Sequence, residues 1–191
     1  MKKVILFMHV SLDGFVQGPK GNGDIEYFIV DKEINDFASK RIQSCDAALY
    51  GRKTWQLMES YWPVAGNQPN ASAHTKEHAK WYAGIDHYVL SRTIKSDPSK
   101  KLKVIGQDLV KEINDIRNGK GNEILIFGSP STGHALQQLG LVDGYWLFVN
   151  PILIGSGTPL FDGQKATTKL RLVESHKFNS GVVSVSYDRI K

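Results

Sequence analysis

Three segments of the sequence place glycine, hydroxyl or cationic residues directly after a run of apolar residues. In the first, residues 47–50 lead into Gly51, Arg52 and Thr54. The corresponding residues elsewhere are Ser91 and Arg92 after 87–90, and Gly128, Ser129, Ser131 and Thr132 after 123–127. Glycine lets a backbone approach a ligand closely, and hydroxyl and guanidinium groups donate hydrogen bonds to phosphate oxygens. Each segment alone is also typical of a turn or a helix cap, but the three together indicate one extended ligand with several phosphate groups.

A different chemistry is indicated by the pattern His-x-x-Glu-His at residues 74–78. On a helix, the imidazoles of His74 and His78 would lie on one side and could share a zinc ion, and Glu77 could activate a bound water. The segment is polar, however, and the sequence does not single out a third ligand. We therefore predict no metal site and keep a zinc hydrolase only as an alternative.

The elements that must position these residues alternate along the chain. Runs of β-branched and aromatic residues predict strands at 4–10, 47–50, 87–90, 102–105, 123–127, 145–149, 169–173 (extending toward 178) and 182–190. Helical periodicity predicts helices over 31–43, 107–119 and 131–141, whereas the polar stretch 66–76 is expected to be a long surface loop. The alternation predicts an α/β fold, with a mostly parallel sheet covered on both faces and an antiparallel hairpin at the C-terminal end. No repeat or composition shift marks a boundary, so we expect residues 1–191 to form a single domain.

Composition narrows the class of ligand and the location. No apolar run approaches the ~20 residues that a membrane-spanning helix needs. The single cysteine, Cys45, cannot form an intramolecular disulfide, which favours a cytoplasmic location. The net charge of +5 is modest, and aromatic residues are not interleaved with a basic block as in a single-strand binder. We therefore expect a small anionic ligand, with neither a nucleic acid nor a membrane as partner.

Several of these segments also carry a family resemblance. Gly-Arg-Lys-Thr-Trp at 51–55 resembles a signature of dihydrofolate reductases, and Leu-Ser-Arg-Thr at 90–93 is similar to the segment that holds the 2′-phosphate of NADPH in that fold. Residues 136–161 resemble, more closely, the reductase domain of bacterial riboflavin biosynthesis and its stand-alone relatives, and Ser-Leu-Asp-Gly at 11–14 also matches that group. The resemblance extends in order from residue 4 to about residue 161.

The resemblance implies a dihydrofolate reductase-like, three-layer α/β/α fold with NADPH as cofactor. It implies that Gly51, Arg52 and Thr54 contact the NADPH phosphates, that Ser91 and Arg92 contact the 2′-phosphate, and that Gly128, Ser129, Ser131 and Thr132 surround the pyrophosphate. The family often has a Gly-Gly pair after the strand at 123–127, where this chain has Phe127-Gly128-Ser129-Pro130. Because proline lacks an N–H donor, that contact is expected to differ in detail.

The resemblance leaves the substrate side open. Asp13 lies just after the first predicted strand, where it could bind substrate or cap a turn. Folate reduction uses a carboxylic acid on the first helix, for which Asp36 and Asp31 are candidates, although neither falls cleanly in the family position. His9 could face the nicotinamide or be an ordinary core histidine.

The activity implied is hydride transfer from NADPH to a small heterocycle, either a pterin or a ribosylaminopyrimidine. These correspond to a dihydrofolate reductase or a 5-amino-6-(5-phosphoribosylamino)uracil reductase. The resemblance also implies a homodimer paired through sheet edges. A non-catalytic NADP-binding protein of the same fold remains an alternative.

Overall fold

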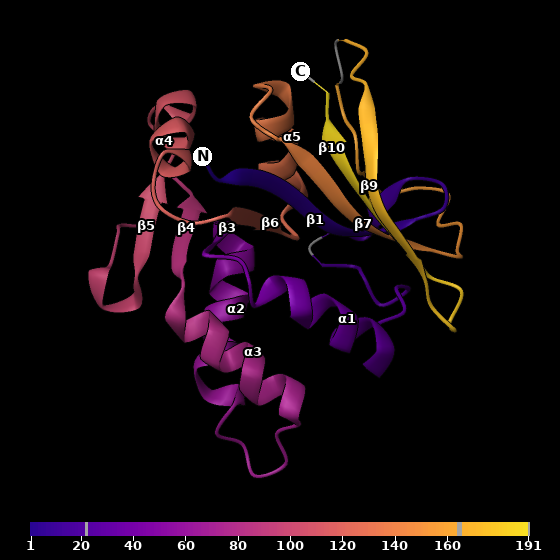
Figure 1. Cartoon of the computed structure of the whole chain (residues 1–191), viewed down its shortest axis with the longest axis horizontal. Helices are drawn as coiled ribbons and strands as arrows, with labels where there is room; N and C mark the ends of the chain where they lie inside the picture. Colours follow the sequence, from indigo (N-terminus) through magenta and orange to yellow (C-terminus); the bar gives the residue numbers. More distant parts are fainter. Residues whose placement is uncertain (22, 164–165, 191) are drawn as a thin grey trace.

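Figure 1 shows the computed structural model of the chain, which describes residues 1–21, 23–163 and 166–190. Its centre is an eight-stranded sheet with the strand order β5-β4-β3-β6-β1-β7-β10-β9. The strands are β1 (Lys3–Ser11), β3 (Ala47–Gly51), β4 (Asp86–Leu90), β5 (Leu102–Ile105), β6 (Glu123–Phe127), β7 (Gly144–Asn150), β9 (Leu170–Lys177) and β10 (Val183–Arg189). All pairs from β5 to β7 are parallel, whereas β10 pairs antiparallel with both β7 and β9. A separate antiparallel pair joins β2 (Phe15–Gln17) to β8 (Thr158–Pro159).

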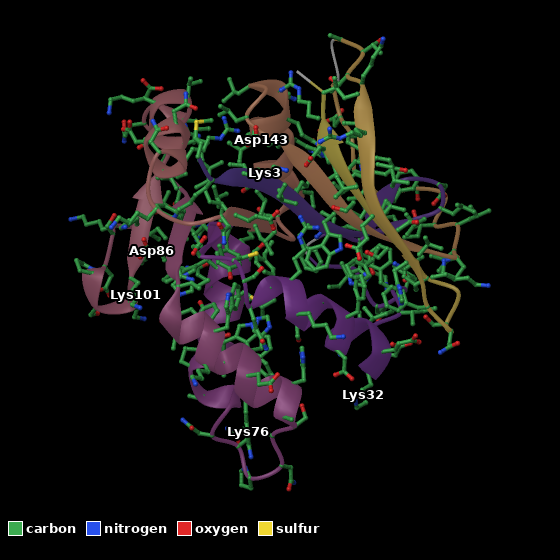
Figure 2. The ribbon with its side chains drawn as sticks, in the orientation of Figure 1. Lys3, Lys32, Lys76, Asp86, Lys101 and Asp143 are labelled. Carbon is green, nitrogen blue, oxygen red and sulfur yellow. The ribbon has the colours of Figure 1, made fainter. Side chains whose placement is uncertain are left out.

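Helices cover both faces of this sheet (Figure 1). They are α1 (Lys32–Ile42), α2 (Arg52–Ala65) and α3 (Ala73–Gly84) on one face, α4 (Leu109–Arg117) and α5 (Pro130–Gln138) on the other, and a short 3₁₀ turn, η1 (Pro98–Lys100). The labelled lysines Lys32, Lys76 and Lys101 lie at the periphery of the molecule (Figure 2). The α/β class, the mostly parallel sheet and the C-terminal antiparallel hairpin are therefore confirmed.

The core consists of two apolar clusters, one on each face of the sheet. Alternate residues of a strand point to opposite faces, so Leu6 of β1 packs in one cluster with Ile113 and Leu136 of α4 and α5. Its neighbour Ile5 packs in the other cluster with Ile34 of α1. Burial on both faces explains why the central strands read as continuous apolar runs.

The expectation of a long loop over residues 66–76 is wrong at its C-terminal end, because α3 begins at Ala73. Ser72 starts the helix by accepting a hydrogen bond from the backbone N–H of Thr75 at 3.1 Å. Further along, α3 buries Trp81 and Tyr82 in the core. The helix is thus stabilised by its N-cap and by two aromatic residues near its C-terminal end. Its first turns are polar and lack the apolar periodicity that would have predicted a helix.

The parallel strands bring their carboxyl ends to one edge of the sheet. β3 and β6 are neighbours in the sheet, with Leu49 opposite Ile126. α2 starts directly after β3, and α5 starts shortly after β6. The N-termini of these two helices therefore meet at the same edge. Within the described ranges, no helix has the length and apolar character needed to cross a membrane.

Candidate functional site

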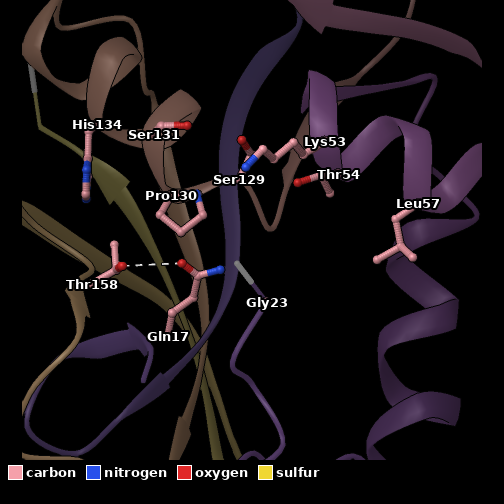
Figure 3. Close-up of a pocket in the computed structure, with 10 residues that line it drawn as sticks. All are labelled: Gln17, Gly23, Lys53, Thr54, Leu57, Ser129, Pro130, Ser131, His134 and Thr158. Carbon is pink, nitrogen blue, oxygen red and sulfur yellow. Dashed lines mark hydrogen bonds between the residues drawn. The ribbon is translucent and has the colours of Figure 1, made fainter. Parts of the chain in front are cut away.

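A cavity of about 590 Å³ with several hydroxyl groups in its lining lies at this edge, between the starts of α2 and α5 (Figure 3). We call it the hydroxyl cavity. Its described lining residues are Gln17, Gly23, Lys53, Thr54, Leu57, Ser129, Pro130, Ser131, His134 and Thr158. The small β2–β8 sheet closes one side, where the Thr158 hydroxyl bonds Gln17 Oε1 at 3.3 Å (Figure 3). The cavity thus brings together Thr54, Ser129 and Ser131, which the sequence placed on two separate segments.

The two segments touch each other through Gly51. A Cβ atom at this position would overlap the Ser129 hydroxyl and lie 3.0 Å from Thr132 Oγ1. The Ser129 and Thr132 hydroxyls are themselves 2.9 Å apart and buried. Gly128 completes the junction with φ +52°, a left-handed conformation that favours glycine. Only a residue without a side chain fits at position 51, because hydroxyl groups of the neighbouring segment occupy that space.

Both helix N-termini at this edge lack a side-chain cap. Neither Gly51 before α2 nor Ser129 before α5 makes a side-chain cap hydrogen bond. The first backbone N–H groups of a helix have no partner within it and carry partial positive charge. Pro130 costs little here, since it occupies the first helical turn, where an N–H has no helical partner in any case. The arrangement suits the phosphate groups of an anionic ligand.

Ser91 and Arg92 lie at the same edge, one strand further along, at the end of β4. Ser91 Oγ accepts a hydrogen bond from the Thr93 backbone N–H at 3.1 Å, which shapes a turn, and Arg92 is exposed. Neither residue lines the hydroxyl cavity, and nor does Arg52, the first residue of α2. The structure therefore places these three residues at the same edge of the sheet but outside the described wall of the cavity.

A second cavity, of about 430 Å³, lies between the sheet and helices α1–α3. We call it the aromatic cavity. Its described lining residues are Phe7, His9, Ile34, Asn35, Ala38, Ile42, Tyr50, Met58, Tyr61, Trp62, His74, Thr75, His78 and Phe127. The Tyr50 and Phe127 rings stack with centroids 5.7 Å apart. None of the described lining residues is an aspartate, a glutamate, a lysine or an arginine, so this cavity suits a flat, uncharged ring.

Two histidines of the aromatic cavity are held in their neutral form. Burial lowers the pKa of His9 to about 4, and its ring stacks on Phe148 with centroids 5.0 Å apart. Burial, followed by the charge of His74, lowers the pKa of His78 to about 4. The His78 ring stacks on Trp62 at 4.0 Å. Near neutral pH these imidazoles are uncharged hydrogen-bonding groups.

Asp13 bridges two loops and lines neither cavity. Its carboxylate accepts hydrogen bonds from Ser11 Oγ at 2.6 Å and from the backbone N–H groups of Ile154 and Gly155 at 3.2 and 2.7 Å. The Ser11 hydroxyl is the main cause of the lowered pKa of Asp13, and the two amides add to it. Asp13 therefore stays ionised and ties the segment after β1 to the segment after β7.

The two predicted acids of the first helix also point elsewhere. Asp31 is the N-cap of α1 and accepts a hydrogen bond from the Ile34 backbone N–H at 2.9 Å. Asp36 is exposed and pairs with Lys32, whose hydrogen bond is the main cause of the lowered pKa of Asp36. The residues of α1 that line the aromatic cavity are Ile34, Asn35, Ala38 and Ile42. The structure thus brings neither carboxylate to the cavity.

The His-x-x-Glu-His segment forms part of the aromatic cavity wall rather than a metal cluster. His74 Nδ1 is 2.7 Å from Ser39 Oγ, and Glu77 Oε2 accepts a hydrogen bond from Gln43 Nε2 at 3.2 Å. Among the residues that the structure describes, no three His, Cys, Asp or Glu side chains are grouped so that they could hold a metal ion. The two imidazoles are instead engaged with a hydroxyl and an indole.

Sequence reasoning gave Tyr61 and Trp62 as core or pocket wall, but it missed Phe7, Tyr50 and Phe127 of the aromatic wall and the residue that fixes His9. Asn150, at the end of β7, lies 3.4 Å from His9 Nδ1. The available signal was the alternation along β1, which puts Phe7 and His9 on one face. A second signal was that Tyr50 and Phe127 directly precede the glycines singled out at positions 51 and 128.

Comparisons with known proteins agree with this fold. Residues 2–184 match the model of the RibD C-terminal domain family. The chain is 32% identical over 188 residues to the uncharacterized protein YyaP of Bacillus subtilis (strain 168), covering 97% of this chain and 94% of YyaP.

Solved structures show the same fold. A pyrimidine reductase-like protein from Corynebacterium diphtheriae superposes with a TM-score of 0.70 at 18% identity, covering 100% of this chain and 92% of that one. RibD of Acinetobacter baumannii gives a TM-score of 0.66 at 16% identity, covering 100% of this chain and 59% of RibD. The chain therefore belongs to the RibD C-terminal domain family, and its fold is that of the riboflavin-pathway reductase domains.

Proposed function

We propose that this chain is an NADPH-dependent reductase that acts on a small, flat heterocycle. One observation carries the proposal: the two cavities lie on opposite sides of the same two strand ends. Tyr50 and Phe127 line the aromatic cavity, whereas the residues directly after them, Gly51 and Gly128, adjoin Ser129 and Thr54, respectively, which line the other cavity. A phosphate-binding site and a ring-binding site at one strand edge suit a dinucleotide and its substrate.

The residues at the hydroxyl cavity fit the phosphates of NADPH. Thr54, Ser129 and Ser131 supply hydroxyl donors, and the uncapped starts of α2 and α5 supply backbone N–H groups. Gly51 and Gly128 allow the two segments to approach each other closely. Arg92, exposed at the end of β4, would hold the 2′-phosphate.

The protein would contribute orientation and exclusion of water. NADPH, when bound, supplies the hydride. The stacked rings of Tyr50 and Phe127, with Phe7 edge-on to Phe127, form an aromatic wall that would align the substrate ring. Since the described lining of the aromatic cavity holds no carboxylate, the proton added after hydride transfer would come from water, and not from Asp13, Asp31 or Asp36.

Of the two substrate classes, we propose the ribosylaminopyrimidine rather than the pterin. A pterin presents an amino-substituted, donor-rich edge that a carboxylate pairs with well, and the aromatic cavity offers none among its described residues. The names of the structural neighbours, a pyrimidine reductase-like protein and RibD, support a pyrimidine. A cytoplasmic location, as favoured by the single cysteine, is part of this proposal.

We also propose a homodimer that pairs through β9. This strand is the last in the sheet, and all eight of its residues are exposed. Leu172 and Val173 are 53% and 57% exposed, which is unusual for apolar residues of a strand edge facing water. Pairing with a second copy would satisfy the free backbone groups of the strand and cover these side chains.

The proposed activity can be tested with purified protein. We expect NADPH to bind in a calorimetric titration, and its absorbance to fall when the ribosylaminopyrimidine is added. Dihydrofolate in place of the pyrimidine should give little or no decrease. Binding of NADPH without turnover of either substrate would favour the non-catalytic NADP-binding alternative, and no binding of NADPH would refute both readings.

A further inference from the structure

The imidazole of His9 is a polar group of the aromatic cavity whose orientation is fixed by its neighbours. This residue lies on β1, where it faces the cavity beside Phe7. Its ring is stacked on Phe148, with centroids 5.0 Å apart and planes 19° apart. Stacking holds the plane of the imidazole, but it leaves open which ring nitrogen carries the proton.

Asn150 answers that question through two contacts with backbone groups. Its Oδ1 lies 2.8 Å from the backbone N–H of Ile29, which can only donate, so this atom must be the amide oxygen. Its Nδ2 lies 2.9 Å from the backbone carbonyl of Phe148, which can only accept, so this atom must be the amide nitrogen. Asn150 is 1% exposed, and its amide therefore has a single consistent orientation.

The remaining amide hydrogen of Asn150 sets the tautomer of His9. Nδ2 of Asn150 is 3.4 Å from His9 Nδ1. Because the amide nitrogen can only donate, Nδ1 must accept, and a neutral imidazole then carries its proton on Nε2. Nε2 has no hydrogen-bond partner among the residues that the structure describes. The ring is neutral near pH 7, because burial lowers its pKa to about 4.

We propose that the Nε2–H of His9 is a fixed hydrogen-bond donor in the aromatic cavity and selects flat rings that carry an acceptor at the edge meeting it. The ligand class is thus a heterocycle with a carbonyl oxygen or a bare ring nitrogen at that position. This inference deepens the proposed function and rests on it for the identity of the cavity as the substrate site. His9 transfers no proton, since a neutral imidazole is a very weak acid; it is a specificity-determining residue.

The tautomer can be measured without any ligand. In protein labelled with ¹⁵N-histidine, we expect the His9 signals near pH 7 to show an unprotonated Nδ1 and a protonated Nε2. A protonated Nδ1, or a ring exchanging between both tautomers, would overturn the proposal. This measurement does not depend on whether the protein binds NADPH or turns over a substrate.

The donor can be tested with two probes of nearly the same shape. Quinoline carries one acceptor nitrogen at its edge, and naphthalene carries none. His9→Phe keeps a flat ring against Phe148 but removes the N–H. We expect it to weaken quinoline binding relative to naphthalene by roughly two- to tenfold, the effect of one neutral hydrogen bond.

His176→Phe is the matched control. His176 also stacks on an aromatic ring, that of Phe37 at 4.7 Å, but it lies on β9 and does not line the aromatic cavity. It should leave the ratio of the two affinities unchanged. An unchanged ratio in His9→Phe, with a thermal midpoint close to that of the parent, would overturn the proposal. A selective loss of quinoline in a protein that binds no NADPH would support the donor while refuting the proposed reductase.

Discussion

The close contact at Gly51 allows a quantitative test of the hydroxyl cavity. In Gly51→Ala the new methyl group would overlap the Ser129 hydroxyl and lie 3.0 Å from Thr132 Oγ1 and 3.2 Å from Ser129 Cβ. The Ser129–Thr132 pair is buried and hydrogen-bonded, so little free space is left for the new methyl group. Overpacking of this kind costs about 1–3 kcal/mol. For a chain of this size, that corresponds to a fall in melting temperature of about 2–12 °C.

A second substitution separates this steric effect from a general loss of stability. Ser129→Ala removes the oxygen that the new methyl group would overlap, and leaves the contacts at 3.0 and 3.2 Å, which small shifts can relieve. We therefore expect Gly51→Ala with Ser129→Ala to be more stable than the sum of the single effects predicts, by about 0.5–2 kcal/mol. Urea unfolding of the four proteins measures this coupling energy.

Cofactor binding provides the second readout of the same four proteins. Ser129→Ala should weaken NADPH by roughly two- to tenfold, as expected for one neutral hydroxyl donor. Gly51→Ala should weaken NADPH more, since it displaces both hydroxyl groups and the start of α2. Strictly additive stabilities, or a Gly51→Ala protein with unchanged stability and unchanged NADPH affinity, would refute the close packing of the two segments and the role assigned to it.

Three further predictions concern other parts of the molecule. Arg92→Ala should weaken NADPH by roughly ten- to a hundredfold and hardly change NADH, as expected for loss of a charged hydrogen bond to the 2′-phosphate; equal losses in calorimetric titrations would contradict this. Leu172→Lys on the exposed strand β9 should shift the protein from dimer to monomer in light scattering, whereas a dimer that persists would place the interface elsewhere. The free energy of unfolding should fall as the pH is lowered from about 6.5 to about 4, because His9 and His78 stay neutral when folded and bind protons when unfolded. Urea midpoints at pH 7 and pH 5 should differ less in His9→Phe than in the parent, and an equal difference would refute the neutral state of His9.

The sequence was informative wherever the signal was local. Apolar runs followed by Gly51 and Gly128 marked strand ends correctly, because a buried strand and its turn are encoded within a few residues. The contact between Gly51 and Ser129 was not available from the sequence, since it depends on β3 and β6 being neighbours in the sheet. Strand order is set by packing across the whole domain, so no short segment of the sequence shows which strands are neighbours.

For the side chains of the helices, the sequence could predict some orientations and not others. Along an α-helix, residues four apart share a face, so Ile34, Ala38 and Ile42 define the buried side of α1. Asp36 lies two residues from Ile34, about 200° around the helix, and must point away from that side. This geometry was readable in advance. The position of His74 and His78 was not, because α3 has too few apolar residues in its first turns to reveal which side packs inward.

The change of face between consecutive residues at the ends of β3 and β6 has a consequence for how this protein could diversify. Positions 50 and 127 border the aromatic cavity, and positions 51 and 128 adjoin Ser129 and Thr54 in the wall of the hydroxyl cavity. Replacing Tyr50 or Phe127 would reshape the aromatic cavity while the glycine that follows each residue stays in place. New substrates could therefore be acquired without changing the residues that bind the coenzyme, whereas a single residue inserted before either glycine would move that glycine to the opposite face of its strand.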